Sequence, residues 1–121
     1  MVIDSTKFNQ VIMITGYTDG RKGIDGLADM IKYVYNMDPF EKEVLYIFCG
    51  KNSRKIKGIV WEGDGFVLLT KRLDGKESRF HWPRNGEEAR ALTQQQLQWL
   101  MTGLRIDLKP TIKQIEQRLT L

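Results

Sequence analysis

Residues 44–82 contain the pattern that decides the fold, four apolar segments that read VLYIFC (44–49), KIKGIVW (55–61), FVLLTKRL (66–73) and SRFHW (78–82). The connections between them are short and rich in glycine: GKNS (50–53), EGDG (62–65) and DGK (74–76). An Asp-Gly pair between apolar runs favours a hairpin, because glycine accepts the positive φ that tight turns require. Connections this short join antiparallel neighbours. The sequence therefore predicts an antiparallel meander with strands at Val44–Cys49, Lys55–Trp61, Phe66–Leu73 and Ser78–Trp82.

The flanking segments add one strand and three helices. Residues 11–15 form a short apolar run that predicts a strand, and apolar residues spaced three and four apart predict a helix over residues 24–35. Near the C-terminus, two capping-box patterns, Thr93 with Gln96 and Thr111 with Gln114, predict helix starts. The expected fold class is α+β: a small antiparallel β-meander of about four to five strands packed against an N-terminal helix and two C-terminal helices.

Length and composition are those of one globular domain. The 121 residues are 41% apolar and 28% charged, which is ordinary for a folded protein. We expect a single domain over residues 1–121, in which residues 106–121 form an amphipathic helical tail. No apolar run approaches the roughly 18 residues of a membrane helix, and residues 1–10 lack the apolar core of a secretory signal. The expected location is therefore the cytoplasm.

The chain has one cysteine, Cys49, and one histidine, His81. A single cysteine excludes an internal disulfide, and one Cys with one His cannot form a closed structural zinc site. Cys49 falls in a predicted strand, so we interpret it as a buried, inert thiol. The sequence predicts no metal site and no cofactor.

The net charge of +4 is concentrated in residues 51–79. This segment holds four acids and eight basic residues, which are Lys51, Arg54, Lys55, Lys57, Lys71, Arg72, Lys76 and Arg79. The rest of the chain is neutral overall. Such a concentration is typical of an electrostatic footprint for nucleic acid. It is equally consistent with a solvated hairpin face on which lysines discourage edge pairing, and charge alone does not decide between the two interpretations.

A second basic pair, Arg21 and Lys22, lies in a glycine-rich loop directly before the predicted N-terminal helix. Backbone N–H groups at a helix start, together with two cations, could hold a phosphate. The loop lacks the order of glycines, lysine and Ser/Thr that defines a Walker A motif. The structural alternative is a tight turn in which Arg21 pairs with Asp19 or Asp25.

Four aspartates, Asp19, Asp25, Asp38 and Asp64, are the candidates for a metal-dependent nuclease site. Each adjoins glycine or proline or begins a helix, so turn and cap chemistry explains all four. We therefore predict no catalytic residues and no enzymatic activity.

Seven landmarks occur in a fixed order along residues 11–105. They are TDGRKGIDGL (18–27), DPF (38–40), the basic turn at 51–57, WEGDGF (61–66), KRL (71–73), FHWP (80–83), and LT (92–93) followed by Leu97, Leu100 and Gly103. This order resembles the small accessory protein, called TnpB or the second open reading frame, of a bacterial insertion-sequence family whose transposase is a separate DDE-type protein. The sequence departs from the family pattern at Gly20, where Met is usual, at Gly58, where an aliphatic residue is usual, and in a basic turn with less arginine.

The resemblance implies a role in the transposition of a mobile element, and it supplies no catalytic residues. We expect a non-enzymatic accessory factor that binds nucleic acid, such as the DNA of the element's ends, through a basic β-hairpin. The expected contact residues are Arg21, Lys22, Lys51, Arg54, Lys55, Lys57, Lys71 and Arg72. The alternative is a protein-interaction module that docks on the transposase or another element-encoded protein through the predicted tail helix, Thr111–Leu119. The sequence does not indicate an oligomeric state.

Overall fold

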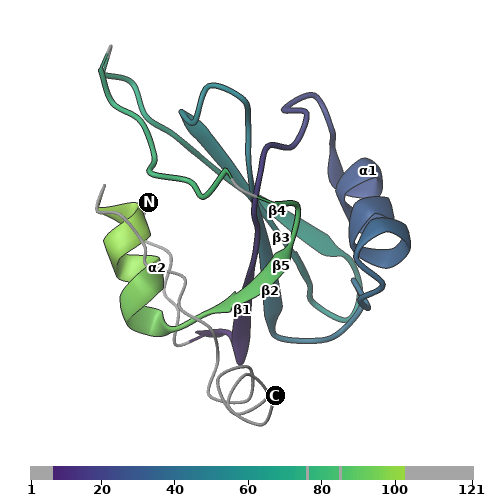
Figure 1. The fold of residues 1–121 in the computed structure, drawn as a ribbon. Coiled ribbons are helices and arrows are strands. Elements are labelled where there is room, and N and C mark those ends of the chain that lie inside the picture. The colour runs from purple at the N-terminus through teal and green to yellow at the C-terminus, as the bar shows by residue number, and fades with distance from the viewer. Residues whose placement is uncertain (1–6, 76, 85, 103–121) are drawn as a thin grey trace, which may run out of the picture.

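The computed structural model describes residues 7–75, 77–84 and 86–102. It contains a five-stranded sheet with the spatial order β4-β3-β2-β1-β5. The strands are β1 (Gln10–Ile14), β2 (Val44–Cys49), β3 (Lys55–Trp61), β4 (Phe66–Arg72) and β5 (Ala89–Leu92). The helical elements are α1 (Ile24–Asp29), the π-helical turn η2 (Met30–Val34) and α2 (Gln94–Met101). Helices α1 and α2 lie on opposite faces of the sheet (Figure 1), which gives the described chain a layered α+β architecture.

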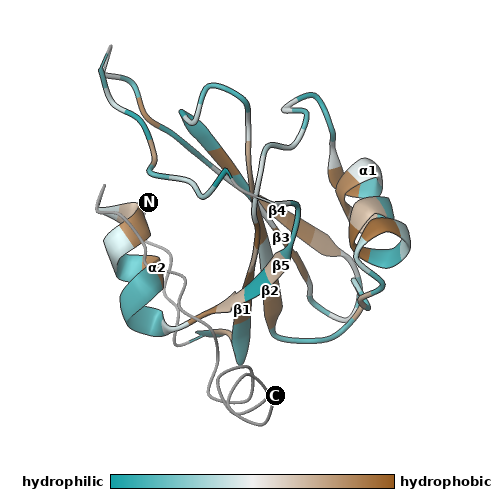
Figure 2. Cartoon of the chain, in the orientation of Figure 1, coloured by the Kyte–Doolittle hydropathy of each residue, from teal (hydrophilic) through white to brown (hydrophobic). Residues whose placement is uncertain are grey.

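The middle strand, β2, is buried along its whole length. Its even-numbered residues pack with Leu27 of α1 and Ile31 of η2, and its odd-numbered residues pack with Leu97 and Leu100 of α2. A strand covered on both faces needs apolar side chains in both directions, which explains the unbroken apolar run. Figure 2 shows this arrangement as apolar colouring along the strands, with hydrophilic loops at the upper end of the sheet.

The sheet is mixed rather than fully antiparallel. β2, β3 and β4 form the predicted antiparallel meander, but β1 runs parallel to β2, with Val11 opposite Leu45. The chain between β1 and β2 includes α1 and η2, and a connection of this length allows a crossover between parallel neighbours. The predicted antiparallel meander is therefore right for β2–β4 and wrong for the sheet as a whole.

The fourth predicted strand, Ser78–Trp82, is not a strand. Phe80 and Trp82 are nevertheless buried in the core on the α2 side of the sheet. The Phe80 amide donates to the Ser53 carbonyl (2.6 Å), and the Trp82 indole N–H donates to the Ile14 carbonyl (3.0 Å). The apolar alternation of this segment therefore reflects burial against a face of the sheet rather than pairing at its edge.

Strand β5 has no counterpart among the predicted strands. It pairs antiparallel with β1, with Ile12 opposite Ala91. Thr15 fixes the chain that leads into β5, because its hydroxyl donates to the Gly86 carbonyl (2.8 Å) and accepts from the Glu88 amide (2.9 Å). The four residues of β5 carry too little apolar alternation to predict a strand, so its formation depends on partners distant in the sequence.

The helix predicted over residues 24–35 is present as α1 followed by η2. Leu27 and Ile31 face the sheet within one core cluster. Asn36 adopts a positive φ of 53° and ends the helical run, a conformation that asparagine tolerates better than most residues.

The predicted capping box at the start of α2 is confirmed. The Gln96 amide donates to the Thr93 hydroxyl (3.1 Å), and the Thr93 amide donates to the Gln96 side-chain oxygen (2.9 Å). The second predicted C-terminal helix and the tail at 106–121 lie outside the described residues. In the part of the chain that the structure describes, no helix has the length and apolar character of a membrane span.

Trp82→Phe should destabilise the fold, because the Ile14 carbonyl loses its indole donor inside the core. A buried polar group left without its partner costs about 1–3 kcal/mol, and the lost ring volume adds to this. The free energy of unfolding, measured by urea denaturation, should therefore fall by at least about 1 kcal/mol. Trp99→Phe is the matched control, since Trp99 on α2 is 37% exposed and its substitution should cost less than about 0.5 kcal/mol. Equal effects of the two substitutions would contradict the role assigned to Trp82.

The Cys49 thiol should be unreactive in the native protein. Burial raises its pKa to about 12, although the neighbouring Ser53 side chain opposes the shift. The folded state favours the protonated thiol, and this preference stabilises the fold. The stabilisation is complete below the ordinary pKa of 9.0 and is lost as the pH rises toward 12. Dithiobis(nitrobenzoate) at pH 8 should label the native protein slowly and the urea-unfolded protein fully, since the thiolate is the reactive form. Rapid labelling of the native protein would show that Cys49 is accessible.

Candidate nucleic-acid interface

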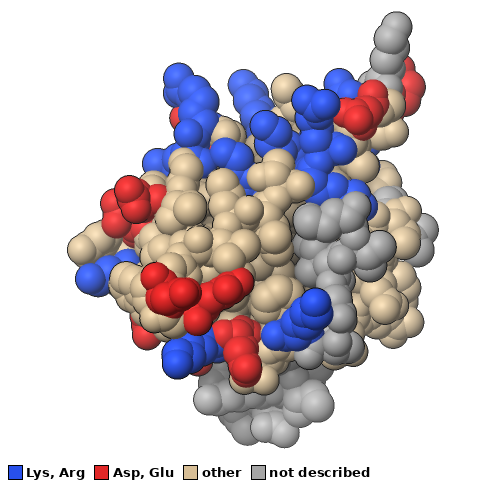
Figure 3. Space-filling model, turned by 180° about the vertical axis from the view of Figure 1, so that it is seen from behind, with Lys and Arg blue, Asp and Glu red and all other residues tan. Residues whose placement is uncertain are grey.

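Three connections meet at the upper end of the sheet in Figure 1: the loop after β1, the turn between β2 and β3, and the chain that follows β4. Lys and Arg side chains gather along this edge in the view of Figure 3. The connections surround a cavity of about 530 Å³. Five of its lining residues are basic: Arg21, Lys51, Arg54, Lys55 and Arg72. One lining residue, Asp74, is acidic. The described lining therefore has a strong excess of positive charge.

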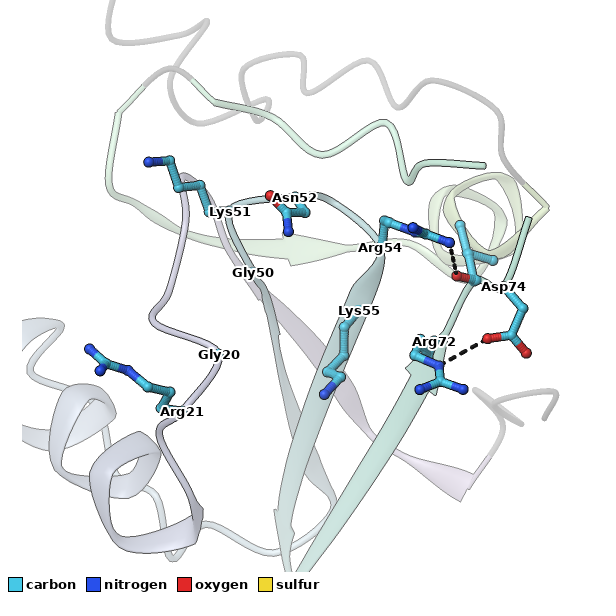
Figure 4. Close-up of a pocket in the computed structure, with 10 residues that line it drawn as sticks. Gly20, Arg21, Gly50, Lys51, Asn52, Arg54, Lys55, Arg72 and Asp74 are labelled. Atoms are coloured by element: carbon cyan, nitrogen blue, oxygen red, sulfur yellow. Dashed lines mark hydrogen bonds and ion pairs between the residues drawn. The ribbon is translucent and has the colours of Figure 1, made fainter. Parts of the chain in front are cut away.

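The register of β3 and β4 brings the basic turn and the basic end of β4 together. Lys55 and Arg72 lie directly opposite each other, and opposite residues of an antiparallel pair share a face of the sheet. This is the α1 face, because Ile59, four residues along β3 from Lys55, packs in the cluster beneath α1. Figure 4 shows the two side chains on neighbouring strands at the cavity.

Lys71 lies on the other face of the sheet, because consecutive residues of a strand alternate between faces. Its partner in β3 is Ile56, which packs in the core on the α2 side. The Lys71 ammonium donates to the carbonyl of Met101 at the end of α2 (3.3 Å). Lys71 is therefore directed away from the cavity, although it adjoins Arg72 in the sequence.

Lys57 and Lys22 also lie outside the cavity lining. The Lys57 ammonium donates to the carbonyls of Gly20 (2.7 Å) and Lys22 (2.8 Å). The aliphatic stem of Lys22 runs along Gly26 of α1, where a Cβ on Gly26 would meet it at 3.4 Å. The structure thus gathers five of the eight predicted contact residues in one cavity and gives Lys22, Lys57 and Lys71 contacts elsewhere.

Two of the cavity's arginines form exposed ion pairs. Arg21 pairs with Asp19 (2.8 Å), one of the two partners that the sequence allowed, and Arg72 pairs with Asp74 (2.9 Å). Hydrogen bonds from Arg21 hold the pKa of the Asp19 carboxyl well below its usual range. Surface ion pairs contribute little to stability, so either guanidinium can exchange its carboxylate for a phosphate at low cost.

The other three basic side chains of the cavity are of two kinds, one that binds backbone carbonyls and two that have no polar partner in the part of the chain that the structure describes. Arg54 donates from Nη2 to the carbonyls of Leu73 (3.2 Å) and Gly75 (3.0 Å), which fixes the chain after β4 (Figure 4). Among the described residues, the side chains of Lys51 and Lys55 have no hydrogen-bonding or ion-pair partner. These two ammonium groups are therefore the freest cations of the site.

Two backbone N–H groups of the glycine-rich loop are not available to a phosphate, although the sequence predicts N–H donors there. The Arg21 amide donates to a carboxylate oxygen of Asp19 (2.9 Å), and the Lys22 amide donates to the Asp19 carbonyl (3.1 Å). Both N–H groups are thus already used inside the loop. A phosphate contact from this loop would come from the Arg21 side chain rather than from these amides.

The aspartates considered for a nuclease site have the turn and cap positions expected of them. Asp19 pairs with Arg21, Asp25 lies in the first turn of α1, and Asp38 accepts a hydrogen bond from the Phe40 amide (2.9 Å). In residues 7–75, 77–84 and 86–102, no group of three or more His, Cys, Asp or Glu side chains is placed to hold a metal ion.

Comparisons with known proteins identify the family. A family model described as IS66 Orf2 like protein matches residues 9–110. Two relatives from Sinorhizobium fredii (strain NBRC 101917 / NGR234) carry the names "Uncharacterized protein y4hO" and "Uncharacterized protein y4jC". The first is 36% identical over 95 residues, covering 78% of this chain and 80% of the relative. The second is 26% identical over 104 residues, covering 84% and 86%. No solved structure gives a significant match. Because the family model spans most of the chain, and the resemblance in the sequence motifs agrees with it, the chain belongs to the IS66 Orf2-like family.

Proposed function

We propose that the protein is a non-enzymatic accessory factor of insertion-sequence transposition that binds the phosphate backbone of nucleic acid in the basic cavity. The observation that supports this most directly is that five basic residues, from three separate segments, line one cavity of about 530 Å³. Family membership supplies the association with insertion sequences.

The composition of the cavity favours phosphate over bases as the group recognised. Guanidinium and ammonium groups are the usual protein partners of phosphate oxygens. The described lining contains no aromatic side chain on which a base could stack. Phosphate contacts position a nucleic acid and carry no sequence information. We therefore expect binding with little sequence preference and a strong dependence on salt.

Docking on the transposase or another element-encoded protein is a second candidate function, favoured by the opposite end of the sheet. There Phe40, Trp61 and Phe66 form a cluster with ring centroids 4.9–5.3 Å apart. Phe40 is 50% exposed. Aromatic residues are enriched in protein interfaces, so this cluster is a candidate contact. The tail helix considered from the sequence lies outside the described residues.

Replacing Lys51, Lys55 and Arg72 together with alanine should weaken binding to duplex DNA from the element ends. Each neutralised phosphate contributes roughly 0.9 to the slope of log affinity against log salt, so the loss of three contacts should flatten that slope by about 2.7. Fluorescence polarisation over a salt series measures both the affinity and the slope. Stability should change by no more than about 0.5 kcal/mol per substitution, because the side chains are at the surface.

The matched control replaces Lys7, Lys32 and Lys42 with alanine. These lysines are exposed and lie outside the cavity lining, so this variant loses the same charge and should keep most of the affinity and slope. The nucleic-acid proposal fails if the unmodified protein shows no salt-sensitive binding, or if the cavity variant binds as well as the original. The docking function then becomes the preferred account.

Phe40→Ser should weaken binding to the transposase of the same element if the aromatic cluster is its contact. Loss of a central interface aromatic commonly costs at least about 2 kcal/mol, and calorimetric titration of the two purified proteins measures the loss. Val34→Ser is the control, since Val34 is also exposed but lies outside the aromatic cluster. DNA binding should not change in either variant. Equal affinity of the Phe40 variant and the original protein would contradict this assignment.

A further inference from the structure

We infer that Lys57 is a positioning residue of the basic cavity: its ammonium fixes the glycine-rich loop, residues 18–23, so that Arg21 lines the cavity, and it does not itself bind the nucleic acid. The inference rests on the proposed function, because it concerns the same cavity. It assigns to Lys57 a role different from the phosphate contact that the sequence predicts.

The position of Lys57 in the sheet suits it to hold a loop. It lies in β3, opposite Phe48 of β2 on one side and Thr70 of β4 on the other, so its backbone is fixed by two neighbouring strands. Like Lys55, it belongs to the set of β3 residues that face α1. Its side chain therefore extends from a fixed backbone, on the face of the sheet where the loop leads into α1.

The two carbonyls that Lys57 binds belong to the residues on either side of Arg21 in the chain. Its ammonium donates to the carbonyl of Gly20 (2.7 Å), immediately before Arg21, and to that of Lys22 (2.8 Å), immediately after it. Both bonds are charge-assisted and therefore stronger than neutral ones. Fixing the carbonyls on both sides of one residue limits the directions that its side chain can take, and Arg21 is the loop's basic residue in the cavity lining.

The loop has few other contacts that could hold it. At its start the Thr18 amide donates to the Cys49 carbonyl (2.8 Å), and at its end Gly23 is the N-cap of α1. Between these points, a Cβ built on Gly20 would meet no atom within 4 Å, and the same is true of Gly23. The Arg21–Asp19 ion pair lies within the loop and cannot tie it to the sheet.

Lys57 also improves the electrostatics of the site. The carbonyl oxygens of Gly20 and Lys22 carry partial negative charge next to a cavity that we propose for phosphate. Binding to an ammonium compensates this charge, so the loop presents the Arg21 guanidinium to an anion without an opposing pair of free carbonyls. Two of the three ammonium donors of Lys57 are used in this way.

The central test compares Lys57→Met with Lys71→Met in binding to duplex DNA from the element ends. Both variants lose one positive charge on neighbouring strands of the same sheet. Lys57 loses two carbonyl contacts and Lys71 loses one, and Lys71 lies on the face away from the cavity. Lys57→Met should weaken binding by about the same factor as Arg21→Met and lower the salt slope by roughly 0.9, the contribution of one phosphate contact. Lys57→Arg should restore most of the affinity, because a guanidinium can also donate to two carbonyls.

A double-mutant cycle separates positioning from direct contact. If Lys57 acts through Arg21, adding Lys57→Met to the Arg21→Met variant should change the affinity by less than about twofold, because the interaction is already lost. If Lys57 binds phosphate itself, the two effects should add. Additive effects would overturn the inference, as would equal losses in Lys57→Met and Lys71→Met.

Hydrogen exchange of the free protein tests the loop without any nucleic acid. The amides of residues 20–23 should exchange faster in Lys57→Met than in the original protein, Lys57→Arg or Lys71→Met. Unchanged exchange in Lys57→Met would overturn the inference even if the affinity falls. Absence of salt-sensitive binding by the original protein would instead overturn the proposed function, and the exchange rates would still report whether Lys57 fixes the loop.

Discussion

The burial of β2 on both faces is the constraint on which the rest of the structure depends. β2 pairs with β1 along one edge and with β3 along the other. Its side chains are apolar on both faces, so each face needs apolar cover. α1 and η2 supply that cover on one face, and α2 with Phe80 and Trp82 supplies it on the other. The middle of the sheet is therefore enclosed, and polar connections are confined to its two ends. The basic cavity forms at one of these ends.

The alternation of side chains along a strand places neighbouring basic residues on opposite faces of the sheet, which their spacing in the sequence does not indicate. Lys71 and Arg72 are consecutive, yet Arg72 lines the cavity and Lys71 binds the carbonyl at the end of α2 on the other face. Lys55 and Lys57 share a face, yet the loop that leads into α1 covers Lys57 and leaves Lys55 free. A count of charges over residues 51–79 does not contain this information, because it ignores both the face of the sheet and the segment that covers it.

Local signals predicted the elements that local chemistry determines. β2, β3 and β4 match the predicted strands to within one residue, because glycine-containing turns bound them, and the Thr93–Gln96 capping box marks the start of α2. The direction of β1 and the existence of β5 depend on pairing between distant segments, so they could not be predicted in this way. The same limit applies to the cavity. The carbonyl partners of Lys57 are 37 and 35 residues away in the sequence, and no local pattern indicates that the loop passes over it.

The cavity lies at the end of the sheet where the parallel strands β1 and β2 both finish. In α/β sheets, ligands bind outside the carboxyl ends of parallel strands, where the loops that follow the strands separate. Here the loop after β1 supplies Arg21, and the turn after β2 supplies Lys51. β4 runs in the same direction as β2, so its carboxyl end brings Arg72 to the same end of the sheet. Arg54 and Lys57 bind backbone carbonyls and hold two of the surrounding segments, whereas the ammonium groups of Lys51 and Lys55 have no polar partner in the described chain. Held segments suit the phosphate site that we propose, because an anion binds more tightly when its ligands are fixed before it arrives. This division between fixing and free cations supports that proposal over a solvated hairpin surface.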